Sequence, residues 1–79
     1  MSHEFAGGDS SNIHWARFDP DKQTLQVDFR GKDGSKTSTY EYTGFNDRDW
    51  LAFQRAQSKG LHFATKIRGK FSHTKIWSK

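Results

Sequence analysis

The chain has 79 residues, of which 32% are hydrophobic and 15% are aromatic. At this length we expect one small domain, whose core must rely on rings because each ring buries a large area. The chain contains no cysteine, which excludes disulfides and thiolate metal sites. No apolar run reaches the length of a membrane span or a signal peptide. We therefore expect a cytoplasmic protein.

The charge is unevenly distributed along the chain. The first 49 residues contain six basic and nine acidic residues, whereas the last 30 contain seven basic residues and no acid, for a net charge of +4. A basic segment of this kind favours an anionic partner such as nucleic acid. It is also typical of a solvated surface that aids solubility.

Residues 1–10 contain two glycines and no hydrophobic periodicity, which predicts a flexible N-terminal arm. Three segments with strand-like composition follow, at residues 12–18, 24–30 and 37–43. They are joined by the turn "DPDK" and by the glycine-bounded loop "GKDGSK". Connections this short predict an antiparallel meander.

Alternation assigns the faces of these strands. In the first strand we place Ile13 and Trp15 on one face, with His14 and Phe18 on the other. In the second strand the apolar residues face one side and the polar residues the other: Leu25, Val27 and Phe29 against Gln26, Asp28 and Arg30.

Two helices are expected after the strands. Asn46 is a good N-cap, and the carboxylates that follow it suit the first turn of a helix. Phe45 and Trp50 occupy the two positions of a hydrophobic staple. This helix is predicted over residues 47–58, with Gly60 as the left-handed residue that ends it.

The second, shorter helix has Phe63, Ile67 and Phe71 at the i, i+4 and i+8 spacing of a buried stripe. A basic stripe runs about a quarter-turn away. Its residues are Lys59, His62, Lys66, Lys70 and His73. Arg68 lies outside both stripes, where it either pins the helix to the domain or binds an anion.

Together these elements predict an α+β fold, a three-stranded antiparallel meander followed by two helices packed on one face. The domain is expected over residues 11–72, between the N-terminal arm and a basic C-terminal tail at residues 73–79. Trp77 in this tail either closes the core or stays exposed. We expect a monomer.

Tyr40 and Tyr42 are two residues apart and therefore share one face of their strand. They either complete the core beside Leu25 and Phe29 or form an exposed platform on which bases stack. Asp28 on the open face is a poor neighbour for phosphate. Its position favours inward tyrosines and moves a nucleic-acid surface to the second helix.

The segments "SNIHWARFD", "TLQVDF", "YEY" and "AQSKGLHFATKIRGKF" resemble the KTSC domain family. This family is named for the C-terminus of some lysyl-tRNA synthetases and also occurs as stand-alone bacterial and phage proteins. The resemblance spans residues 11–71. Its most specific residues are Tyr40, Tyr42, Ser58, Gly60, Phe63, Ile67, Arg68 and Phe71. The chain departs from the family pattern at Ala64, where Asn is common, and at Phe71, where Tyr is common. Attachment to a tRNA synthetase implies RNA binding.

No catalytic or metal-binding constellation is evident. Ser58 and His62 lie four residues apart, but no third group orients the histidine, so we expect a helix-end serine and a surface histidine. The four histidines show no metal-ligand spacing, and "GKDG" lacks the ending of a phosphate-binding loop. We expect no enzyme, no cofactor and no metal.

The leading hypothesis is a small non-catalytic module that binds tRNA or single-stranded RNA through the basic face of the second helix. The expected binding residues are Lys59, His62, Lys66, Arg68, Lys70, His73 and Lys75. The alternative is a protein-interaction or regulatory module, phage-encoded, that docks its basic face on an acidic protein. Trp15 or Trp77 would then serve as an aromatic anchor.

Overall fold

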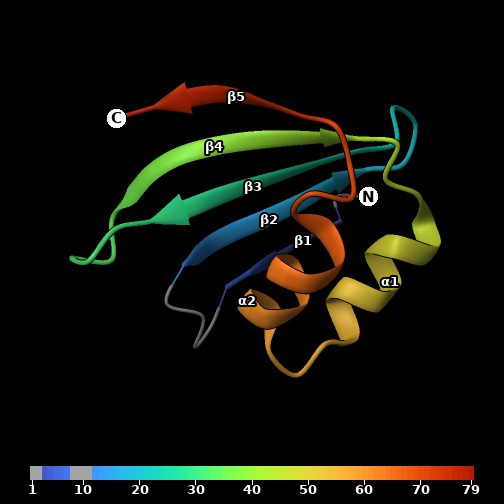
Figure 1. The fold of residues 1–79 in the computed structure, drawn as a ribbon, viewed down its shortest axis with the longest axis horizontal. Coiled ribbons are helices and arrows are strands. Elements are labelled where there is room, and N and C mark those ends of the chain that lie inside the picture. The colour runs from blue at the N-terminus through green and yellow to red at the C-terminus, as the bar shows by residue number, and fades with distance from the viewer. Residues whose placement is uncertain (1–2, 8–11) are drawn as a thin grey trace.

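The computed structural model describes residues 3–7 and 12–79, which form a five-stranded antiparallel sheet with helices on one face (Figure 1). The strands lie side by side in chain order. They are β1 (His3–Ala6), β2 (Ile13–Asp19), β3 (Thr24–Arg30), β4 (Lys36–Thr43) and β5 (His73–Ser78). Between β4 and β5 the chain forms the helices α1 (Asp47–Arg55) and α2 (Lys59–His62) and a π-helical turn, η1 (Phe63–Ile67).

The α+β class holds, but the predicted three-stranded meander followed by two helices is wrong. Residues 3–6, expected in a flexible arm, form β1, and residues 73–78, expected in a basic tail, form β5. The sequence gives little sign of either strand, because β1 is only four residues long and all six residues of β5 are exposed. The order of such edge strands depends strongly on pairing with a neighbouring strand, which the sequence does not reveal.

A β-bulge at His14 changes the faces predicted for β2. Ile13 pairs with Phe29 and Trp15 pairs with Asp28, which leaves one extra residue on β2. As a result Ile13 is fully buried on the helix side, whereas Trp15 lies on the opposite side of the sheet, called the open face below. The prediction that both residues share a face is wrong.

The start of α1 is as predicted. The Oδ1 atom of Asn46 accepts a hydrogen bond from the backbone N–H of Asp49 at 2.9 Å, and the Asp49 carboxylate accepts one from the N–H of Asn46 at 3.2 Å. This reciprocal pair is a capping box. Phe45 and Trp50, the residues of the predicted staple, are both buried.

The end of α1 differs from the prediction, because the helix stops at Arg55 and Gly60 does not terminate it. Ser58 instead begins the next helix, since its hydroxyl accepts a hydrogen bond from the N–H of Leu61 at 3.2 Å. Gly60 therefore lies inside α2. A serine two residues before a glycine is an N-cap signal here, rather than part of a C-terminal cap.

The second predicted helix is divided into α2, η1 and a turn. The N–H of Arg68 donates to the carbonyl of Phe63, five residues back, at 2.8 Å, which defines the π-helical turn. Phe63 and Ile67 are buried as predicted. The chain then leaves the helix, and Gly69 adopts a φ of 80° that a residue without Cβ reaches freely. Phe71 packs against the core from this turn rather than from a helix.

The core lies between the sheet and the helices and consists largely of rings. Trp50 stacks on Phe18 of β2, with ring centroids 5.6 Å apart, and on Phe5 of β1 at 5.1 Å. The indole Nε1 of Trp50 is buried and has no hydrogen-bond partner among the described residues. The buried apolar residues are Ile13, Ala16, Phe18, Leu25, Val27, Tyr42, Phe45, Trp50, Phe53, Phe63 and Ile67.

Replacing Phe5 by Ala is expected to lower the free energy of unfolding by about 2 kcal/mol, because a partly buried ring loses its packing. Urea denaturation followed by tryptophan fluorescence measures this change. Glu4→Ala, an exposed position on the same strand, is the control and should change the free energy by less than about 0.5 kcal/mol. Equally small effects of both substitutions would show that β1 contributes nothing to the core.

Candidate nucleic-acid interface

The open face of the sheet carries charges of both signs. Glu4 pairs with Arg17, Arg17 with Gln26, and Gln26 with Glu41, so these side chains form one row from β1 to β4. Side chains alternate between the two faces of a strand. Leu25, the residue before Gln26, is buried and pairs with the residues next to Arg17 and Glu41. The row therefore lies on the side of the sheet opposite Leu25.

Asp28 is also on the open face and is only 4% exposed, yet it is well partnered. Its carboxylate accepts a hydrogen bond from the Thr39 hydroxyl at 2.6 Å. It forms ion pairs with Arg17 at 3.4 Å and Lys36 at 3.8 Å. Lys36 also lies 4.6 Å from the ring centroid of Trp77, which is 43% exposed and does not close the core. Two cations of this face, Arg17 and Lys36, are therefore engaged by the protein itself.

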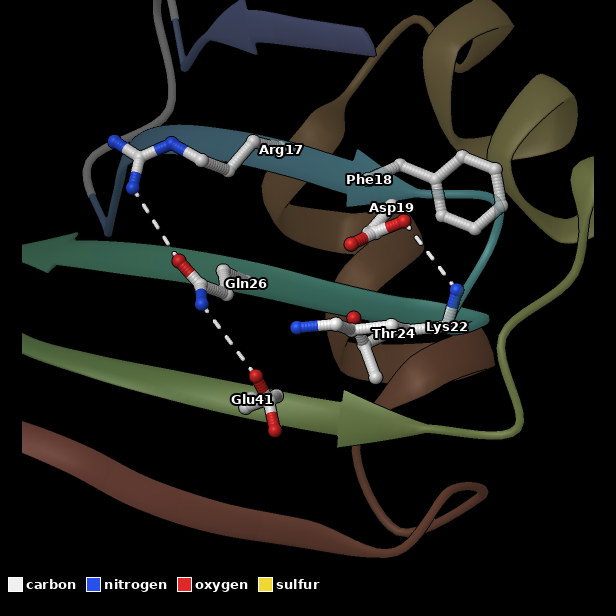
Figure 2. A pocket seen from close by; sticks show the side chains of 7 residues that line it. All are labelled: Arg17, Phe18, Asp19, Lys22, Thr24, Gln26 and Glu41. Carbon is white, nitrogen blue, oxygen red and sulfur yellow. Dashed lines mark hydrogen bonds between the residues drawn. The ribbon is translucent and has the colours of Figure 1, made fainter. Parts of the chain in front are cut away.

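A hollow of about 180 Å³ lies at one end of the open face (Figure 2). It is lined by Arg17, Phe18, Asp19, Lys22, Thr24, Gln26 and Glu41. Arg17 donates to the Gln26 side chain at 3.3 Å, and Gln26 donates to Glu41 at 3.4 Å (Figure 2). Two cationic and two acidic side chains share this hollow, so it offers a mixed surface rather than an anion site.

Tyr40 and Tyr42 face the helices. Tyr42 is 3% exposed and packs 5.5 Å from the ring of Phe63, so it belongs to the core. Burial raises the pKa of Tyr42 to about 12, with Tyr40 adding to the rise and Arg68 opposing it, and the hydroxyl stays protonated at neutral pH. Tyr40 is only partly buried and packs against Phe29 at 5.7 Å. One tyrosine is therefore core, and the other lies at its border.

Strand β5 brings two basic residues to the tyrosines. The ring of His73 lies 5.8 Å from Tyr40 and 5.6 Å from Tyr42, and the ammonium of Lys75 lies 5.7 Å from the Tyr40 ring. Both basic residues are exposed. Within residues 3–7 and 12–79, the ion pairs with Lys or Arg all involve Asp28. No salt bridge to a described acid therefore neutralises Lys75.

Lys59, a predicted binding residue, supports the fold. Its ammonium donates to the carbonyls of Gln54, at 2.8 Å, and Ala56, at 2.5 Å. It also lies 5.3 Å from the ring of Phe5. A lysine in this place satisfies carbonyls at the end of α1 and suits the negative end of the helix dipole.

His62, another predicted binding residue, packs against the core. Its ring stacks on Phe53 with centroids 5.5 Å apart and an interplanar angle of 16°. Burial, followed by the nearby charges of Lys66 and Lys59, lowers the pKa of His62. The ring is therefore neutral at pH 7 and adds little attraction for an anion.

The predicted basic stripe is divided by the π-helical turn. Lys66 points toward α1, where it lines a hollow of about 290 Å³ with Asp49. Arg68 lines a different cavity toward β3. Lys70 is exposed on the turn that follows η1. His73 and Lys75 are the basic residues beside the tyrosines, and Arg68 is close enough to influence the pKa of Tyr42. Lys66 lines the separate hollow beside α1.

Arg30 is a basic residue that the sequence did not single out. Alternation predicts that it lies opposite Phe29, but the strand register shifts between the two residues, and both line the same cavity. The Arg30 guanidinium donates through Nε to the carbonyl of Ile13 at 3.0 Å. No feature of the sequence marks this shift, because it arises from pairing with β4.

The Ser58–His62 pair is engaged in the fold, with the serine hydroxyl capping α2 and the histidine ring stacked on the core. In the part of the chain that the structure describes, no group of three or more His, Asp or Glu is placed to hold a metal. None of the helices there is long and apolar enough to cross a membrane.

The sheet, the helix pair and the tyrosine motif define the class of protein. The family model of the KTSC domain matches residues 9–71, and the chain belongs to this family. It is similar to a KTSC domain protein from Yersinia pestis whose crystal structure gives a TM-score of 0.81 at 34% sequence identity. The similarity covers 98% of this chain and 100% of that one. No curated protein matches the sequence.

Acidification is expected to destabilise the domain through His62. Its pKa is lowered in the folded protein, so the unfolded chain binds more protons as the pH falls below about 6.5. The stability that the neutral ring contributes is present above that pH and is lost progressively below it. Urea denaturation at about pH 7.5 and about pH 5.5 should show a larger loss for the wild type than for His62→Gln.

An NMR titration of the His62 ring gives an independent measurement. A pKa at or above that of a free histidine peptide, or equal pH dependence of the wild type and His62→Gln, would contradict this assignment.

Proposed function

We propose that this KTSC domain is a small, non-catalytic, cytoplasmic module that binds tRNA or single-stranded RNA. The contact surface, called the β5 surface, comprises Tyr40, Arg68, Lys70, His73 and Lys75. The observation that carries the proposal is the grouping of His73 and Lys75 around the partly exposed ring of Tyr40. The described strand carboxylates point to the other side of the sheet.

The chemistry of the β5 surface suits a flexible strand of nucleotides. Tyr40 supplies a ring on which a base stacks, and the His73 ring beside it extends the platform. Lys75 lies over the Tyr40 ring, so an arriving base would displace its ammonium toward the adjoining phosphate. Arg68 and Lys70, both exposed on the turn between η1 and β5, would extend the positive surface beyond the strand. Stacking combined with cations tolerates many base sequences.

The open face supports RNA binding less well, because Asp28 engages Arg17 and Lys36. A non-catalytic role is supported by the engagement of Ser58 in capping and of His62 in stacking. A catalytic pair needs a nucleophile and a base within hydrogen-bond reach of each other and of a substrate.

The affinity for a labelled single-stranded RNA, measured by fluorescence anisotropy, should fall as salt rises. We expect log affinity against log salt to have a slope of about −0.7 for each phosphate neutralised. Lys70→Glu combined with Lys75→Glu should weaken binding by at least about tenfold and reduce the magnitude of the slope by about 1.4, since two phosphate contacts are lost.

Lys22→Glu combined with Arg48→Glu is the matched control, because both residues are exposed and the net charge changes by the same amount. It should weaken binding by less than about threefold, since distant exposed charges are largely screened. Equal losses in the two double variants would indicate non-specific attraction. An absence of binding by the wild type at low salt would refute RNA binding.

The alternative is a protein-interaction or regulatory module, in a bacterial or phage setting. It is favoured by the adjacent Ile76 and Trp77 on β5, which are 47% and 43% exposed. An exposed aromatic beside lysines is a suitable anchor for an acidic protein. A pull-down with and without nuclease separates the two functions. A protein partner that survives nuclease and is lost in Trp77→Ala supports this alternative, whereas capture that requires RNA supports the proposed function.

A further inference from the structure

A cavity of about 280 Å³ lies between the end of β3 and the segment formed by α2 and η1. The residues that matter for its chemistry are Phe29, Arg30, Gly60, Phe63, Ala64 and Arg68. It is separate from the hollow on the open face and borders the β5 surface through Arg68.

The charge of this cavity is entirely positive among its described residues. Arg30 and Arg68 both line it, and none of the described lining residues is acidic. Two guanidinium groups that share one concave space, with no carboxylate among its described lining, create a positive local potential. Such a potential favours an anion, and the planar fork of each guanidinium suits a group with several oxygen atoms.

One of the two guanidinium groups is held in place. Arg30 donates to the carbonyl of Ile13 through both Nε and Nη2, which fixes the plane of the group. Nη1 takes no part in that contact. Arg68 follows the π-helical turn, where its own N–H is bonded to the Phe63 carbonyl. Its exposed side chain is therefore attached to a fixed backbone position at the mouth of the cavity.

Asn12 is the other polar residue among the described lining, and the remaining described walls are apolar. Phe29 and Phe63 meet edge to face with centroids 5.2 Å apart. Gly60 and Ala64 lie about one turn apart on the helical wall, and because Gly60 has no side chain and Ala64 only a methyl group, the space stays open. The volume lies just below the range of about 300–1,000 Å³ that is typical of pockets for drug-sized ligands. It therefore fits a small anionic group with a short apolar extension.

We propose that this cavity binds a phosphate monoester, the group found at a 5′-phosphorylated RNA end and on a free mononucleotide. A monoester carries about −1.5 to −2 charges at pH 7, which two guanidinium groups match better than they match the single charge of a diester. The sugar would lie against the phenylalanine rings. The RNA end as the source of this group rests on the function proposed above.

The test compares one short single-stranded RNA with a 5′-phosphate and with a 5′-hydroxyl, using fluorescence anisotropy with a label at the 3′ end. The phosphorylated strand should bind about tenfold more tightly, because charge-assisted hydrogen bonds are gained. Adenosine monophosphate alone, followed by NMR, should shift the backbone resonances of Ala64 and Arg68, whereas adenosine should not.

Two variants test the location. Ala64→Leu fills the cavity without changing charge and should abolish the preference for the phosphorylated strand while leaving the affinity for the hydroxyl strand unchanged. Thr65→Leu, the exposed neighbour, is its control and should keep the preference. Arg68→Lys keeps the charge but loses the planar fork, so it should reduce the preference by at least about threefold. Thermal unfolding verifies that each variant is folded.

The outcomes separate this inference from RNA binding. Equal affinities for the two strands, or a preference that survives in both Ala64→Leu and Arg68→Lys, would overturn the phosphate site and leave RNA binding intact. Binding of adenosine monophosphate without binding of either RNA would support the cavity and refute the RNA-binding function. Binding of none of the three would refute both.

Discussion

The fold depends on aromatic stacking between the sheet and the helices. Because aliphatic residues are few, rings make the main contacts between the two layers. Trp50 of α1 contacts two strands at once, through Phe5 and Phe18. A second contact, between Phe63 and Tyr42, joins η1 to β4. Because each ring buries a large area, a few such contacts hold a sheet whose outermost strands bury little of their own.

The same packing determines which side of the sheet carries acidic and which carries basic side chains. Rings occupy the helix side of the central strands, and the pleat therefore sends the strand carboxylates, such as Glu41, to the open face. On β5 the first part of the strand places His73 and Lys75 beside the tyrosines. A positive side of the molecule thus arises from strand pairing. Arg68, which follows η1 and lies outside the predicted stripe, faces the cavity toward β3, whereas Lys66 lines the hollow beside α1.

Features that depend on contacts within one element could be predicted from the sequence. The capping of α1 by Asn46 and the alternation of β3 are of this kind, and so are the buried positions of Phe63 and Ile67. The inward placement of the tyrosines could be predicted because Asp28, on the opposite face of the sheet, would repel the phosphates of a nucleic acid. The KTSC family was recognisable because its motif consists of residue types at fixed positions along the chain, which can be read without the fold.

Features that depend on distant partners could not be predicted. The bulge at His14 and the register shift at Arg30 arise only when neighbouring strands pair. Lys59 looks like a surface cation in the sequence, yet it reaches back to the carbonyls that end α1. The candidate site was accordingly found in part: the basic residues of β5 were identified, but their arrangement around Tyr40 and the cavity at Arg30 were not.

The indole N–H of Trp50, which has no partner among residues 3–7 and 12–79, bears on how the molecule opens. A buried donor without an acceptor costs about 1–3 kcal/mol, and the ring of Phe5 lies against this indole. Detachment of β1 would uncover the face of the indole that Phe5 covers. Because β1 is also an edge strand, we expect local opening to begin there and the amides of β1 to exchange with solvent by a lower-energy route than those of the central strands.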